Sequence, residues 1–306
     1  MTVYRSTPKE DSMIHRKKLK RVLQADLLKA FRENKVPEEM IKNLEEKIAE
    51  LGEFIPTVGI FGKTGVGKSS LCNALFGKDT ARVADIDACT RHPQEVFIQM
   101  SQDGSGITVI DLPGVGENKL RDAEYKALYQ QVIPKLDLII WVIKADDRTF
   151  TVDESFYDEV IKPQLELAKT PFLVVVNQVD RLNPIRDWNT EANQPGLAQM
   201  KTIGERTHWA SDKFRVPTHQ VIAISAVEKY NLGALVEAII DIVPNDKKLG
   251  FLNQMEEDVT TEKSEQSAFA GIVEYLKDAY KEIKPYIPEI IAALKWLFKV
   301  AKTIVI

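Results

Sequence analysis

The residues with the clearest chemistry form one stretch, Gly62 to Ser69, whose sequence is GKTGVGKS. It has the pattern G-x-x-x-x-G-K-[ST] and lies between an apolar run at 57–61 and a helix-forming run at 70–76. Glycines let the backbone turn its N–H groups toward a phosphate, and the start of the following helix attracts the same anion. The Lys68 ammonium would contact the β- and γ-phosphates, and the Ser69 hydroxyl would bind Mg²⁺. The predicted phosphate-binding residues are Gly62, Lys63, Thr64, Gly65, Val66, Gly67, Lys68, Ser69 and Ser70.

A carboxylate and a glycine follow a second apolar run, in the sequence DLPG. Asp111 at the strand end would hold Mg²⁺ through water, and the Gly114 N–H would contact the γ-phosphate. Thr90 lies in the preceding loop, where its hydroxyl and carbonyl would reach Mg²⁺ and the γ-phosphate; an ordinary loop residue is the alternative. Thr80 has the same chemistry but follows the helix end too closely to fold back. These residues predict a Mg²⁺ site formed by Ser69, Thr90 and Asp111.

A third group of residues indicates which base is bound. The sequence NQVD at 177–180 ends another apolar run. The Asp180 carboxylate can accept hydrogen bonds from N1–H and N2–H₂ of guanine, a donor pair that adenine lacks, so it would select GTP over ATP. Asn177 would tie this loop to the phosphate loop, and a backbone N–H at Ser225-Ala226 would meet guanine O6. The predicted base-binding residues are Asn177, Gln178, Asp180, Ser225 and Ala226.

The composition is that of an ordinary globular protein, with 306 residues, 44% apolar and 28% charged. A formal net charge of −4 argues against a surface that grips nucleic acid as a whole. Cys72 and Cys89 have no metal-ligand spacing and fit a reducing compartment, and Cys72 is expected in the core. We find no secretory signal and no uninterrupted apolar run long enough to cross a bilayer, which predicts a cytoplasmic location.

Alternating strand and helix patterns over residues 55–244 predict an α/β domain with a mixed, mostly parallel six-stranded sheet and helices on both faces. The runs at 138–143 and 172–176 are apolar throughout, as parallel strands covered on both sides require. The expected strands are 57–61, 95–101, 106–111, 136–144, 172–177 and 220–225, with the second and third forming an antiparallel hairpin at the sheet edge. The expected helices are 68–76, 120–133, 152–168, 197–213 and 231–242.

Two helical regions flank this domain. Residues 1–54 are expected to form a hairpin of helices at 12–34 and 37–51, because leucines and other apolar residues recur there at three- and four-residue spacing. Residues 245–306 are expected to begin with a polar, acidic linker over 245–265, with at most a short helix, and to continue as helices from about residue 267.

The ordered set GKTGVGKS, Thr90, DLPG, NQVD and Ser-Ala resembles the Era/TrmE-like superfamily of P-loop GTPases. The segments KSSLCNALF at 68–76 and DACTR at 87–91 further resemble the bacterial YfjP-type GTPases. The resemblance covers about residues 55–243. It implies a domain that binds GTP or GDP with Mg²⁺, hydrolyses GTP and changes the order of its loops with the γ-phosphate. Some Era-like relatives associate with the ribosome, but no segment here resembles their RNA-binding KH domain, so ribosome and nucleic acid are disfavoured partners that stay open.

Two positions depart from the family pattern at residues expected to take part in nucleotide binding or hydrolysis. Gln178 stands where the family has lysine, so guanine selectivity should survive while affinity falls by a modest factor. Val115 follows Gly114, where Ras-like enzymes place a water-orienting glutamine, so intrinsic hydrolysis should be slow unless another group orients the water.

A third departure concerns assembly. Gly65 replaces the asparagine that binds K⁺ in some Era-like members, which argues against potassium activation. The loop instead resembles that of septin-, Toc- and immunity-related GTPases, several of which pair across their nucleotide faces. We therefore expect a GTP-dependent homodimer in which the partner or a switch residue such as Arg91 supplies the missing catalytic group. For Arg91, an ordinary solvated loop arginine is an equal alternative.

The flanking helices leave a second function open. The basic run at 16–21 would contact anionic lipid or RNA, although a solvated helix face is the more common case. The stretch 287–304 combines a wide apolar stripe with Lys295, Lys299 and Lys302, which suits a helix lying in a membrane interface or packing on the N-terminal hairpin. The alternative to a cytosolic switch is therefore a peripheral membrane GTPase of the dynamin, septin or immunity-related kind, whose nucleotide state controls assembly.

Overall fold

The computed structural model describes residues 32–33, 36–63, 65–77, 94–99, 106–111, 129–147, 157–279 and 288. They divide between two compact units. The sheet unit contains the described residues of 55–244 and 250–267, and the helical unit contains those of 1–54, 245–249 and 268–306.

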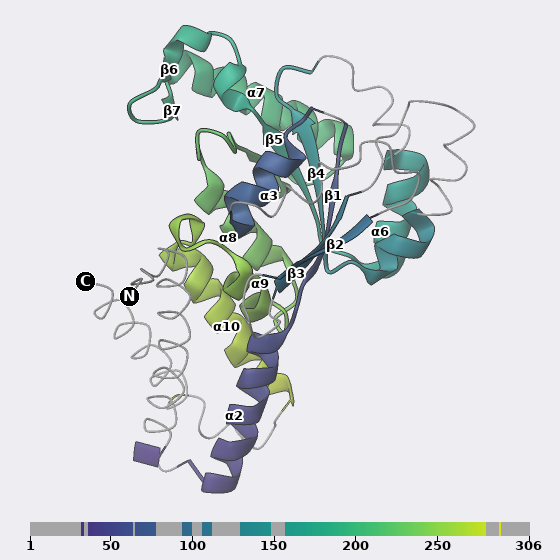
Figure 1. Cartoon of the computed structure of the whole chain (residues 1–306), viewed down its shortest axis with the longest axis vertical. Helices are drawn as coiled ribbons and strands as arrows, with labels where there is room; N and C mark the ends of the chain where they lie inside the picture. Colours follow the sequence, from purple (N-terminus) through teal and green to yellow (C-terminus); the bar gives the residue numbers. More distant parts are fainter. Residues whose placement is uncertain are drawn as a thin grey trace, which may run out of the picture. The chain divides into compact units, whose positions relative to one another are not determined.

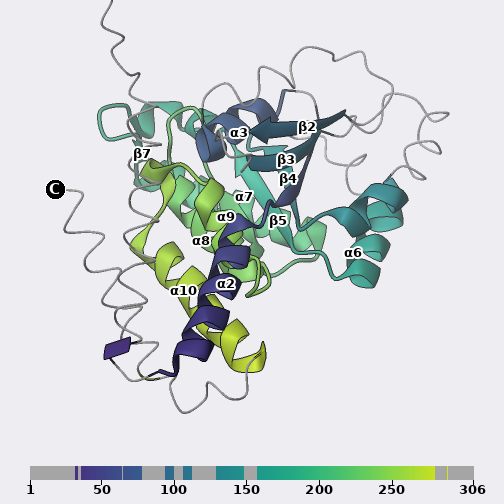
Figure 2. The same ribbon diagram turned by 60° about the horizontal axis from the view of Figure 1, so that its bottom comes forward.

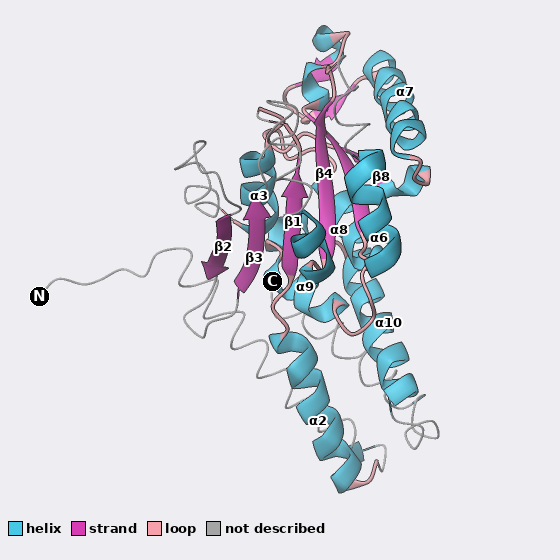
Figure 3. Cartoon of the chain, turned by 90° about the vertical axis from the view of Figure 1, so that its right-hand side faces the viewer, coloured by secondary structure: helices cyan, strands magenta, loops and turns pink. Residues whose placement is uncertain are grey.

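The sheet unit is built on a mixed sheet with the strand order β2-β3-β1-β4-β5-β8 in the described part of the chain (Figures 1 and 3). Neighbouring strands pair in parallel, except that β2 runs antiparallel to β3 at the edge. The strands are β1 Thr57–Phe61, β2 Gln94–Gln99, β3 Gly106–Asp111, β4 Leu138–Lys144, β5 Phe172–Asn177 and β8 Val221–Ala223. The predicted fold class, including its antiparallel edge, is confirmed.

The helices of this unit follow the strands in the order expected for parallel crossovers. They are α3 Lys68–Phe76, α6 Lys162–Ala168, α7 Leu197–Phe214 and α8 Leu232–Ile242. A π-turn, Tyr157–Ile161, leads directly into α6. Single 3-10 turns occupy Ile133–Lys135, Val179–Arg181, Ile185–Asp187 and Thr218–Gln220. A two-stranded ladder of β6 Trp188–Asn189 and β7 Gln194–Pro195 was not predicted, because two-residue strands have no periodicity to detect.

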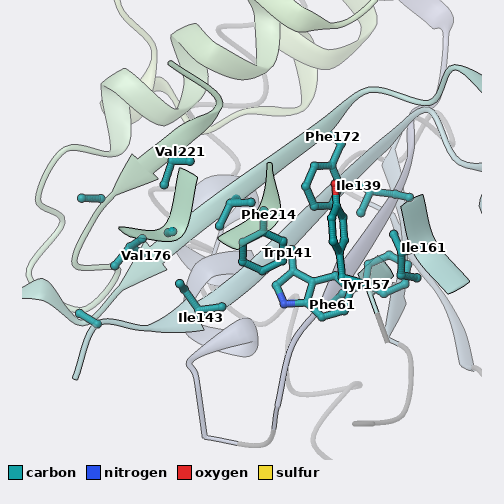
Figure 4. Close-up of a cluster of buried hydrophobic side chains, with 14 of the residues drawn as sticks. Phe61, Ile139, Trp141, Ile143, Tyr157, Ile161, Phe172, Val176, Phe214 and Val221 are labelled. Atoms are coloured by element: carbon teal, nitrogen blue, oxygen red, sulfur yellow. The ribbon is translucent and has the colours of Figure 1, made fainter. Parts of the chain in front are cut away.

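Alternate residues of β4 are buried on opposite faces of the sheet. On one face Trp141 stacks on Phe61, with ring centroids 5.8 Å apart, and meets Phe214 at 5.7 Å and Tyr157 at 6.3 Å (Figure 4). Burial in this aromatic cluster raises the pKa of Tyr157 to about 12, so its phenol stays neutral. On the other face Leu138, Ile140 and Val142 are also fully buried. Both faces of the strand are therefore covered, as its continuous apolar run predicted.

The helical unit contains α2, Glu38–Glu53, whose Ile41, Leu44 and Leu51 are buried. Figures 1 and 2 both draw α2 beside α10, Glu262–Ala279, whose residues from 268 onward belong to this unit. None of the helices in the described part of the chain combines the length and apolar character needed to cross a lipid bilayer. Residues 12–31, and 289–306 with most of the predicted C-terminal stripe, lie outside the described residues.

The predicted polar linker at 245–265 is wrong for the part that follows residue 247. This segment forms α9, Lys248–Gln254, a 3-10 turn at Glu257–Val259 and the first turn of α10. Within the sheet unit, the Glu256 N–H donates to the Leu75 carbonyl at 2.8 Å, and Lys263 pairs with Glu237 on α8 at 2.8 Å. The sequence signal here is weak, because the anchoring apolar residues recur at four-residue spacing but lie in a segment rich in polar and acidic residues. They are Phe251, Met255 and Val259, all buried.

Candidate nucleotide-binding site

The loop between β1 and α3 has a backbone that only glycine tolerates at its two ends. Gly62 has φ +141°, and a Cβ there would lie 2.3 Å from the Val142 carbonyl oxygen. Gly67 has φ +91°, and a Cβ there would lie 2.5 Å from Nδ2 of Asn177. A side chain at Gly62 would therefore collide with β4, and one at Gly67 would collide with Asn177 at the end of β5. Gly62 and Gly67 are therefore required by the packing of the protein itself.

Lys68 begins α3 and folds its side chain over this loop. Its ammonium donates to the carbonyl oxygen of Gly62 at 3.0 Å and to that of Lys63 at 3.4 Å. The positive charge thus lies against the loop whose N–H groups and helix start favour an anion. A triphosphate bound there would meet a cation already in position.

Asn177 joins three segments of the site that are far apart in the sequence. Its side chain is 1% exposed, and its Nδ2 donates to the Val66 carbonyl in the phosphate loop at 2.9 Å. Its Oδ1 accepts from the N–H of Gln178 at 2.8 Å and from the N–H of Ala226 at 3.1 Å. One buried amide therefore connects the phosphate loop, the NQVD loop and the Ser-Ala loop. The first of these links is the one expected from the sequence.

Gln178 replaces the expected lysine and keeps part of its function. Its backbone is left-handed, with φ +64°, and its Nε2 donates to the Gly65 carbonyl at 3.0 Å. Its Oε1 is buried and has no hydrogen-bond partner among the described residues. The side chain therefore braces the phosphate loop as a neutral donor.

The Gln178→Lys substitution is expected to tighten GDP binding roughly threefold to tenfold. A charged donor makes a stronger hydrogen bond to the Gly65 carbonyl than a neutral amide does, and the unpaired Oε1 is removed. Fluorescence titration with a labelled GDP would measure the change. Gln178→Met, which keeps a stem over the base but has no donor, should bind more weakly than the natural chain. A lysine variant that binds no better would exclude a role for charge here.

Asp180 lies in the 3-10 turn Val179–Arg181, directly after the strand that carries Asn177. Its side chain is 19% exposed, and its Oδ2 is 3.9 Å from Nε of Arg181. The carboxylate is therefore partly shielded from water, which strengthens hydrogen bonds to a base. Gln199, on α7, donates to the backbone of this turn and was not predicted as a site residue. A single glutamine on a helix has no sequence signal, since only the packing of α7 brings it to the turn.

Ser225 and Ala226 follow the carboxyl end of β8, which runs parallel to β5. Ser225 is 1% exposed and forms a two-way backbone pair with Tyr230, and its Oγ accepts from the Glu228 N–H at 3.2 Å. The Ala226 N–H already donates to Asn177. The expected contact from this amide to guanine O6 would therefore have to share that donor.

A charged cluster joins the phosphate loop to α7. Lys63 lies 3.6 Å from the Asp147 carboxylate, and Arg206 on α7 donates to the Asp147 carbonyl. The Arg206 guanidinium also lies 3.7 Å above the Trp209 ring. Burial lowers the pKa of Arg206 from its ordinary value, against the effect of the Asp147 and Asp146 carboxylates. Lys63, the second residue of the motif, is thus held by an ion pair with Asp147.

Several predicted site residues belong to the parts of the chain that the structure does not describe in full. Thr64, Thr90, Arg91 and Gly114 lie outside the described residues, and Asp111 is described by its backbone alone. Asp111 ends β3 in register with Ile60 of β1, the strand that leads into the phosphate loop. Ser69 lies in the first turn of α3. An oxygen ligand at each of these positions fits Mg²⁺, which prefers hydroxyl, carboxylate and phosphate oxygens.

Comparison with known proteins shows which family the chain resembles. Residues 57–178 match the family described as 50S ribosome-binding GTPase. The chain is 35% identical to YkfA of Escherichia coli K12 over 281 residues, which are 91% of this chain and 94% of YkfA. YfjP of the same organism is 39% identical over 201 residues, covering 66% of this chain and 67% of YfjP.

More distant similarity extends to Era. GTPase Era of Alkaliphilus metalliredigens is 25% identical, covering 71% of this chain and 63% of that protein. A crystal structure of Era with MgGDPNP and nucleotides 1506–1542 of 16S ribosomal RNA is 26% identical, with a TM-score of 0.43, and the match covers 62% of this chain and 57% of Era. The chain belongs to the family of YkfA and YfjP, within the Era-like P-loop GTPases, which bind GTP and GDP with Mg²⁺ and hydrolyse GTP.

Proposed function

We propose that the chain is a guanine-nucleotide switch whose base selectivity comes from Asp180 and whose phosphate grip comes from residues 62–70. The observation that carries this proposal is the Asn177 network, with bonds of 2.8 to 3.1 Å to three loops. Because one side chain holds the phosphate loop and the base loop together, base and phosphates would be recognised as one rigid unit. Such pre-organisation reduces the entropy lost on binding.

On the phosphate side, the backbone N–H groups of the loop and the Lys68 ammonium would contact the β- and γ-phosphates. Ser69, Thr90 and Asp111 would hold Mg²⁺, which neutralises charge on the phosphate oxygens when bound. The Gly114 N–H would contact the γ-phosphate. Thr90 precedes β2 and Gly114 follows β3 in the sequence. If both contact the γ-phosphate or its Mg²⁺, loss of the γ-phosphate would release both. That release is the proposed switch.

Hydrolysis by this site is proposed to be slow in the isolated monomer. Val115 cannot hydrogen-bond a water molecule, so the orienting group must come from elsewhere. A GTP-dependent homodimer across the nucleotide face, with Arg91 or a partner group at the γ-phosphate, is our proposal for its source. The peripheral membrane alternative depends on residues 287–304, nearly all of which lie outside the described residues, and it stays a prediction.

Nucleotide titration tests the proposal. With Mg²⁺ present, GTP and GDP should bind at least about 100-fold more tightly than ATP, because adenine cannot supply the donor pair that Asp180 accepts. Light scattering in the same samples would detect GTP-dependent pairing. Equal competition by ATP would refute the base assignment, and a constant mass with GDP and with a GTP analogue would refute the dimer.

A further inference from the structure

Gln199 is a fully buried polar residue in the first turn of α7, with 0% exposure. Its Nε2 lies within hydrogen-bond distance of three backbone carbonyls of the loop that follows Asn177. The distances are 3.4 Å to the carbonyl of Val179, 3.2 Å to that of Asp180 and 2.9 Å to that of Leu182. One amide on a helix therefore holds the turn whose middle residue is the proposed guanine-binding carboxylate.

The turn of α7 that carries Gln199 is itself held to the same loop. The Gln199 N–H donates to Oδ2 of Asp187 at 2.9 Å, and the Gly196 N–H donates to the Asp187 carbonyl at 2.8 Å. A Cβ at Gly196 would lie 2.3 Å from the Asp187 carboxylate, so a side chain at this position would displace the carboxylate that accepts from the Gln199 N–H. The start of an 18-residue helix is thus a fixed platform against which the loop is braced.

The surroundings of the Gln199 Oε1 indicate that glutamine is present at this position for its Nε2 donor. Oε1 of Gln199 is buried and has no hydrogen-bond partner among the described residues. An unpaired buried oxygen is unfavourable, and an apolar residue of the same length would avoid it. The three carbonyls would then lose their donor. The position is occupied by a residue that keeps the donor in spite of that cost.

Asn177 and Gln199 hold the base loop from its two sides. Asn177 fixes the start of the loop through the Gln178 N–H, and Gln199 fixes the stretch from Val179 to Leu182. The direction of the Asp180 carboxylate follows from the backbone between these anchors. We propose that Gln199 is a positioning residue for guanine recognition, which aligns Asp180 with both N1–H and N2–H₂ of the base. This inference rests on the proposed role of Asp180.

The test compares guanosine and inosine diphosphates, because hypoxanthine keeps N1–H and lacks the 2-amino group. The natural chain should prefer GDP over IDP by about tenfold or more. Without the 2-amino group of the base, the Asp180 carboxylate loses one of its two hydrogen-bond donors. The Gln199→Met variant fills the same space without a donor. Its affinity for GDP should be about tenfold lower than that of the natural chain, and its preference for GDP over IDP should be at least about threefold smaller. Calorimetric titration of the full chain with each nucleotide measures both.

The ratio of the two affinities separates positioning from general destabilisation. Partial unfolding lowers both apparent affinities by the same factor and leaves their ratio unchanged. An unchanged ratio in Gln199→Met would therefore overturn the inference. Met200→Gln, at a residue that is 53% exposed on the same turn, is the matched control and should change neither value. If the natural chain itself fails to prefer GDP over IDP, the proposed role of Asp180 fails first, and the two failures are distinguished.

Discussion

Asp180→Asn is expected to lower affinity for GTP by about 100-fold or more and to create binding of xanthosine triphosphate. The carboxylate is proposed to accept from both N1–H and the 2-amino group of guanine, whereas an amide facing the 2-amino group would present donor to donor. Xanthine has a carbonyl at that position, which accepts from the new amide. Competition between labelled GDP and each triphosphate, with Mg²⁺ present, would measure the exchange of specificity.

The change from GTP to xanthosine triphosphate binding should depend on the position of the substituted carboxylate and not only on the loss of a negative charge. Asp212→Asn removes a carboxylate whose side chain is 71% exposed on α7 and should leave both affinities unchanged. If Asp180→Asn loses GTP without gaining xanthosine triphosphate, the carboxylate supports the loop but does not contact the base. If it retains GTP, Asp180 is not the selecting residue.

Asn177→Ala is expected to have the largest effect on the fold and the site together. It leaves the Val66 carbonyl and the N–H groups of Gln178 and Ala226 without their partner. Buried groups that lose their hydrogen bonds destabilise a protein by about 1–3 kcal/mol each, and with partial relaxation we expect a total of about 2–4 kcal/mol. GDP affinity should fall by more than about tenfold, since base and phosphate loops are no longer joined. Urea unfolding with and without GDP would measure both.

Asn189→Ala provides the control for this substitution. Its Oδ1 also accepts two backbone bonds, from Glu191 and Ala192 at 3.0 Å, but Asn189 is exposed at the end of β6. Water replaces those bonds when the side chain is removed, so the loss should stay below about 1 kcal/mol and GDP binding should not change. Equal losses in the two variants would show that Asn177 is an ordinary turn residue.

The framework of the sheet unit was predictable because its signals are local. Continuous apolar runs predicted β4 and β5, since a strand buried on both faces needs no polar side. The glycine and lysine spacing placed the phosphate loop between β1 and α3, whose predicted and observed bounds agree. The packing of residues 250–267 was missed, although Phe251, Met255 and Val259 recur at four-residue spacing, because the segment is mostly polar and acidic and the burial of these side chains depends on partners far away in the sequence.

By itself the sequence determined that the chain has the motifs of a P-loop GTPase, and it predicted the roles within the site: Lys68 as the cation for the phosphates, Asp180 as the carboxylate that would select guanine, and Gln178 in the position of the usual lysine. The tertiary structure alone decided how these groups are held. Gln199 and Arg206 come to the site from α7, and the Asn177 bonds to Val66 and Ala226 cross separations of 111 and 49 residues. The physical reason is that a motif records which atoms must meet a ligand. The buried hydrogen bonds that orient those atoms depend on the packing of distant segments, which no local pattern encodes.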